Sequence, residues 1–162
     1  MEATQTNAVA SLLSGLVQEA AYLCTRDLEA SSDEMCNCTQ EGKCRSMLAM
    51  AAELSMFNNL VASVLRGEGG SFPTPEERDA LAAQLVTKAE VIGAMQESVG
   101  AVVSAIESIE ESDWMTKITA PWGMEVTKAH LASWSALHMM YHDGQINLVQ
   151  ILNGDHEVHW MS

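Results

Sequence analysis

The apolar residues of this chain recur at intervals of three and four over long stretches, and this spacing limits the possible fold more than any other feature. An α-helix turns once in about 3.6 residues, so residues at these intervals share one face and bury it against a neighbouring element. Almost nothing alternates with the period of two that is typical of a half-buried strand. The sequence therefore predicts an all-α protein.

Four segments carry this pattern over enough residues to be predicted as helices: residues 6–29, 43–65, 75–111 and 124–153. Thr74, followed by a proline and by Glu77, predicts the start of the third, because Thr caps a helix and Glu completes a capping box. A similar pairing of Ser31 with Glu34 predicts one short turn after the first helix. Four amphipathic helices in 162 residues predict a single domain, residues 1–162, built as a four-helix bundle.

The chain carries 22 acidic residues against eight basic ones, a formal net charge of −14. Binding to DNA, RNA or anionic lipid needs clustered Lys and Arg, and the sequence has no such cluster. No apolar run approaches the roughly 20 residues of a membrane span, and the first residues lack the basic segment of a signal peptide. We therefore expect a cytoplasmic protein whose partners are neither nucleic acids nor membranes.

Three of the four cysteines, Cys36, Cys38 and Cys44, lie close together in a polar segment after the first helix. Their spacing is not that of a standard zinc motif, and no fourth ligand accompanies them. In a cytoplasmic protein such residues are expected to be free thiols. A metal or redox role for them is the alternative that the sequence leaves open.

Two histidines, His138 and His142, stand four residues apart in the fourth predicted helix, so their rings project from the same face. Residues at this spacing can bind one metal ion together. Glu53 is the best third ligand, because it is the lone charge on an otherwise apolar helical face and a buried carboxylate needs a compensating partner. Imidazole and carboxylate ligands suit zinc, nickel or iron(II) better than magnesium or calcium.

Two interpretations without a metal remain open at this point. The histidine pair can be ordinary helix surface or a hydrogen-bonded part of the core. Alternatively, Glu53 can form a salt bridge with a protonated imidazole in a metal-free bundle. Gln145, Tyr141 and His130 are candidates to support the site or contact a substrate, and packing of a satisfied polar side chain is the alternative for each.

The segment from His138 through Tyr141, His142 and Gln145 to Ile146 resembles the helix-four signature of the DinB-like superfamily, which has two His in this spacing followed by Gly-Gln-Ile. The turn at residues 121–123, the acidic turn at 32–35 and the Arg-Ser pair at 45–46 also resemble that family. The resemblance implies a four-helix bundle of up-down-down-up topology that frequently forms homodimers.

The resemblance also implies a divalent metal, often zinc or nickel, held by three His. Two of these positions fall on His138 and His142, and the third falls on Glu53, so a carboxylate replaces an imidazole. Relatives of this kind include thiol-dependent transferases and isomerases, so we expect a small-molecule substrate and a low-molecular-weight thiol. A non-catalytic dimeric bundle, or a small-ligand-binding protein with a structural or degenerate metal site, is the alternative function.

Overall fold

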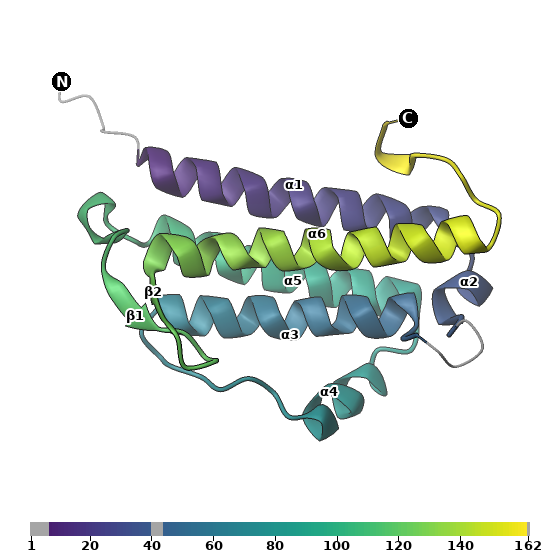
Figure 1. Cartoon of the computed structure of the whole chain (residues 1–162), viewed down its shortest axis with the longest axis horizontal. Helices are drawn as coiled ribbons and strands as arrows, with labels where there is room; N and C mark the ends of the chain where they lie inside the picture. The colour runs from purple at the N-terminus through teal and green to yellow at the C-terminus, as the bar shows by residue number, and fades with distance from the viewer. Residues whose placement is uncertain (1–6, 40–43, 162) are drawn as a thin grey trace.

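The computed structural model describes residues 7–39 and 44–161 and is mostly helical, which confirms the all-α prediction (Figure 1). Its four long helices are α1 (Ala8–Ala30), α3 (Met47–Leu65), α5 (Lys88–Glu107) and α6 (Lys128–Leu152). The shorter elements are α2 (Asp33–Asn37), α4 (Pro75–Ala82), β1 (Lys117–Thr119), β2 (Glu125–Thr127) and the 3₁₀ turns η1 (Glu111–Asp113) and η2 (His159–Met161).

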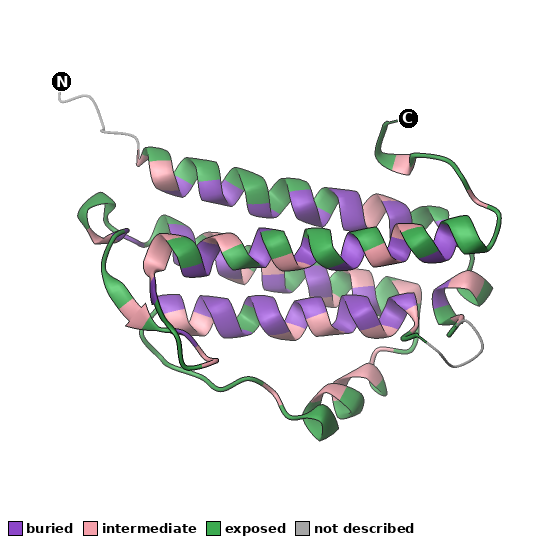
Figure 2. Ribbon diagram, in the orientation of Figure 1, coloured by how far each residue is buried: buried purple, intermediate pink, exposed green. Residues whose placement is uncertain are grey.

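The four long helices lie side by side, and each packs against two of the others. Helices α1 and α3 both contact α5 and α6, so α1 and α3 stand at opposite corners of the bundle. Each helix has a buried side and an exposed side, as Figure 2 shows, and the buried sides supply the apolar residues of one core. The largest apolar side chains that are completely buried in this core include those of Leu28, Met47, Leu54, Met95, Ile106, Leu131, Met139 and Ile146. Helix α3 is apolar on most sides and buries 13 of its 19 residues, which places its one charged side chain, Glu53, close to the interior.

Side-chain caps set the starts of the helices. The Ser46 hydroxyl accepts a hydrogen bond from the backbone N–H of Ala49 at the start of α3, and the predicted capping box of Thr74 with Glu77 is present at the start of α4. The predicted starts at residues 6 and 43 lie outside the described residues. The predicted box at Ser31 is wrong, because Ser32 caps α2 instead.

The third predicted helix, residues 75–111, is wrong in its extent, because the structure divides it into α4 and α5. Thr87 and Glu90 form a second capping box that starts a new helix at residue 88. Apolar residues on both sides of this break keep the interval of three and four, so periodicity alone did not reveal it. As a result α4 lies outside the four-helix core and packs on α3 (Figure 1).

The fourth predicted helix was expected to begin at Met124, and it begins at Lys128 because the preceding residues form a hairpin. Strands β1 and β2 pair antiparallel, with Ile118 opposite Val126. The hairpin turns at Gly123, whose φ of 86° is unfavourable for other residues. At three residues each, these strands are too short for an alternating pattern to show in the sequence.

By length and composition alone, α1, α3 and α5 are long and apolar enough to span a membrane. This differs from the expectation that no segment approaches such a length. In the structure the apolar faces of all three helices contribute to one core together with α6.

Candidate metal centre

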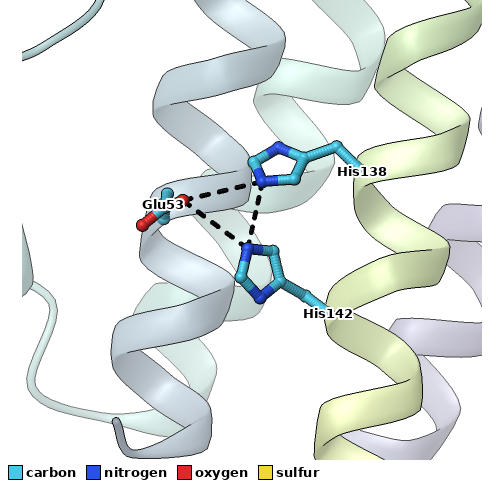
Figure 3. A group of neighbouring side chains, drawn as sticks. All are labelled: Glu53, His138 and His142. Carbon is cyan, nitrogen blue, oxygen red and sulfur yellow. Dashed lines mark hydrogen bonds and ion pairs between the residues drawn. The ribbon is translucent and has the colours of Figure 1, made fainter.

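Helices α3 and α6 place Glu53, His138 and His142 together, as Figure 3 shows. The two Nε2 atoms are 3.0 Å apart, and each lies 3.6 Å from Oε1 of Glu53. All three side chains are at most 15% exposed. The three residues nominated from the sequence therefore meet at one point, with one ligand atom of each directed at the others.

The spacing of these atoms fits a small divalent cation. Zinc binds imidazole nitrogen and carboxylate oxygen at about 2.0–2.2 Å in a tetrahedron, so two neighbouring ligand atoms should be about 3.3 Å apart. The observed separations of 3.0 and 3.6 Å bracket that value. A cluster of two imidazoles and one carboxylate could thus hold a metal with little movement, and it leaves a coordination position for another ligand.

The orientation of His142 is set by Gln145, one turn further along α6. The Nδ1–H of His142 donates to Oε1 of Gln145 at 2.7 Å, which leaves the lone pair of Nε2 directed at the cluster. The ring of His138 packs edge-on against Phe57, with centroids 4.4 Å apart. Gln145 therefore fixes the orientation of an imidazole that could bind a metal.

Two arginines hold the second oxygen of Glu53. Arg45, just before α3, and Arg78, in α4, both donate to Oε2 through Nη1, the latter at 3.5 Å. Contact with His138 and then His142 lowers the pKa of Glu53 the most, burial raises it, and Arg45 lowers it again, so this pKa lies well below its usual value.

This contact was missed in the sequence, because residue 78 is 25 positions from Glu53 and lies in a helix whose path could not be foreseen. The burial of Glu53 was one reason to expect a metal at this site. A buried carboxylate needs a compensating charge, and Glu53 has two guanidinium groups as partners, so its burial alone does not require a metal. The position of the two imidazoles is the stronger indication.

A pocket of about 570 Å³ opens beside the cluster and is within the size range of small-molecule sites. Its polar lining residues include Arg45, Arg78 and the Glu53–His138–His142 group. Leu148 and Leu152 of α6 are among its apolar lining residues and form an apolar wall. Tyr141 is 63% exposed at this wall, with its ring edge against His142.

Two other predicted groups lie elsewhere. His130 is exposed near the start of α6, where its ring lies by Trp134, and it does not line the pocket. Of Cys36, Cys38 and Cys44, only Cys44 lines the pocket. Within the part of the chain that the structure describes, the cysteines belong to no group of potential metal ligands.

A second set of buried polar groups lies between α1 and α6 and was not anticipated. Asp27 and Asp143 are 0% and 4% exposed, and Asn147 donates to Asp27 at 2.7 Å. Burial raises the pKa of Asp143 to about 7, and the negative charge of Asp27 adds to the increase. Burial also raises the pKa of the neighbouring Cys24 thiol, and the negative charge of Asp143 is the next largest cause of this increase.

A comparison with protein-family models supports the resemblance seen in the sequence. A comparison with curated proteins finds no match for the chain. The family model described as the DinB superfamily matches residues 24–146, which is more than half of the 162 residues. The matched span includes Glu53, His138 and His142. The chain therefore belongs to the DinB superfamily.

Proposed function

We propose that this protein is a metal-dependent enzyme that acts on a small molecule, and that its reaction is a thiol-dependent S-transfer or isomerisation. The observation that supports this most directly is the meeting of Glu53, His138 and His142 at the wall of an open pocket. Three protein ligands with an open position are typical of catalytic metal sites, whereas structural sites are closed by a fourth.

The proposed metal is zinc or nickel, and iron(II) also suits two imidazoles and one carboxylate. When bound, such an ion supplies Lewis acidity and favours the thiolate form of a coordinated thiol, which is the reactive nucleophile. Because Glu53 replaces a neutral imidazole, the site is less positive by one charge than a three-His site. It should therefore acidify a bound thiol less strongly.

The protein's own side chains have separable tasks in this proposal. Gln145 holds His142 in the tautomer whose Nε2 can bind a cation. Arg45 and Arg78 fix one oxygen of Glu53 and leave the other facing the imidazoles. Leu148 and Leu152 of α6 offer apolar surface to the carbon skeleton of a substrate.

Several further properties belong to the same proposal. We propose a cytoplasmic homodimer with small-molecule partners and no contact with nucleic acids or membranes, in keeping with the charge of −14. We also propose the family's up-down-down-up connectivity. In its support, the Lys88 side chain at the start of α5 contacts the last carbonyls of α1, and a long segment runs back along the bundle between α3 and α4 (Figure 1).

Metal analysis of protein purified without a metal-chelating column tests the proposal. We expect about one zinc or nickel per chain, and at least tenfold weaker retention in Glu53→Gln, which keeps the shape of the side chain and removes its charge. Glu19→Gln, on the exposed face of α1, is the control. If no metal is retained, or if Glu53→Gln retains it as well as wild type, the proposed centre is wrong. A thiol-conjugation screen on the loaded protein then tests turnover.

A non-catalytic bundle or small-ligand-binding protein is the second candidate, and the two arginines on Glu53 favour it. They neutralise the carboxylate without any metal, as a purely structural ion-pair cluster would. If this candidate has a degenerate site that holds no metal, added zinc leaves the melting temperature unchanged, whereas a metal bound to the native state raises it. If it holds a structural metal, the loaded protein shows no turnover in the thiol-conjugation screen.

A further inference from the structure

The pocket beside the metal centre concentrates positive charge in an otherwise acidic protein. The chain has eight Lys and Arg residues in all, and two of them, Arg45 and Arg78, line this pocket. Among the described residues, Glu53 is the only acid that lines it. Without a metal the local charge is +2 − 1 = +1, and a divalent cation makes it +3. An anionic ligand would therefore be attracted to this pocket in either state.

The two arginines have donors to spare. A guanidinium has five N–H groups, and within the described part of the chain each of these two makes hydrogen bonds to Glu53 alone, through Nη1. The Nε of Arg78 is buried and has no hydrogen-bond partner. Leaving a buried donor unpaired is costly, so a movement of the Arg78 side chain that paired this Nε–H with a ligand oxygen would recover that cost.

Two segments supply these groups from outside the four long helices. Arg45 precedes α3, whereas Arg78 comes from α4, which buries none of its residues. Arg45 and Arg78 are 44% and 33% exposed, so both can be reached from the pocket. Both guanidiniums bind Oε2 of Glu53, whose other oxygen is one of the potential metal-ligand atoms. Both therefore lie close to the candidate metal centre.

From this arrangement we infer that Arg45 and Arg78 form a subsite for an anionic group, a carboxylate or a phosphate, on the substrate. The inference rests on the proposed function and names its substrate class: a small molecule with a metal-binding atom at one position and an anionic group a short distance away. The body of this molecule lies along the apolar wall at Leu148 and Leu152. Arginine forks match both carboxylate and phosphate geometry.

The test compares two probes of nearly the same size and shape, the anion 3-mercaptopropionate and its neutral amide, 3-mercaptopropanamide. Titration calorimetry on metal-loaded protein gives the ratio of their dissociation constants. Both probes carry the same thiol, so the metal–sulfur contact is common to both. Because the charge of the metal also attracts the carboxylate, the ratio is compared only between samples of equal metal content. We expect wild type to prefer the acid at least tenfold, and Arg45→Gln and Arg78→Gln each to reduce the preference severalfold.

The double variant should bind acid and amide about equally. Arg66→Gln is the control, because Arg66 pairs with Glu68 outside the pocket, and it should keep the preference of wild type. Competition by acetate or by inorganic phosphate then shows which anion the subsite prefers. The inference is overturned if neither probe binds, if wild type does not discriminate between them, or if the double variant discriminates as well as wild type does.

Metal content is measured separately on every sample, so the two conclusions can fail independently. If the protein holds metal but binds both probes equally well, the proposed function stands and the anion subsite is wrong. If the protein holds no metal, the same ratio is measured on the metal-free form. A preference for the acid that disappears in the double variant would then support the subsite, although the proposed function would be wrong.

Discussion

The hydrogen bond from His142 to Gln145 should determine how tightly a metal is held. His142 is 2% exposed, so in Gln145→Leu no water would replace the lost acceptor of its Nδ1–H. A buried donor left unpaired costs about 1–3 kcal/mol. The ring can avoid that cost by moving its proton to Nε2 or by turning, and either change takes the Nε2 lone pair away from the cluster. Since 1.4 kcal/mol corresponds to tenfold, we expect metal affinity to fall about tenfold to a hundredfold, the range typical of such supporting residues.

Competition with a chromophoric chelator measures this affinity directly. Gln96→Leu, on the exposed face of α5, is the matched control and should bind metal like wild type. Gln145→Glu restores an acceptor at the same position and should recover most of the affinity. The reasoning is refuted if Gln145→Leu binds metal as tightly as wild type while its circular dichroism is unchanged, because Nδ1 would then need no partner.

Three further predictions concern the fold. Because the pKa of Asp143 in the folded protein is raised to about 7, the folded state keeps a proton that the unfolded chain loses near pH 4. The melting temperature should therefore fall as pH rises between these values, and it should fall less in Asp143→Asn. Iodoacetamide at pH 8 should label the exposed Cys44 and spare the buried Cys24, by mass spectrometry of folded protein. Thr87→Ala should cost about 1 kcal/mol in urea unfolding, because it removes the capping box of α5.

Each of these has a contrary outcome. The same pH dependence in wild type and Asp143→Asn would mean that Asp143 is not the group that titrates. Equal labelling of Cys24 and Cys44 would show that the α1–α6 contact opens readily. An unchanged unfolding midpoint in Thr87→Ala would mean that packing, and not the cap, starts α5.

The sequence predicted the helical class and the three clustered residues because both follow from local spacing. His138 and His142 are fixed relative to each other by the helix itself, and Glu53 was conspicuous as one charge on an apolar face. The break before Thr87 was missed because the apolar pattern continues across it, although Thr87 and Glu90 have the same spacing as the capping box of Thr74 and Glu77. Arg78 could not be placed without knowing where α4 lies, and the Asp27–Asp143 contact joins helices 116 residues apart in the chain.

The position of α4 has a consequence for how this protein can change. Its eight residues leave the core untouched, yet one of them, Arg78, reaches the carboxylate that faces both imidazoles. Substitutions at exposed positions of this short peripheral helix should therefore disturb the core little, whereas a change at Arg78 alters the surroundings of Glu53. The charge beside the candidate metal centre thus depends in part on a helix that the four-helix core does not need for its own packing.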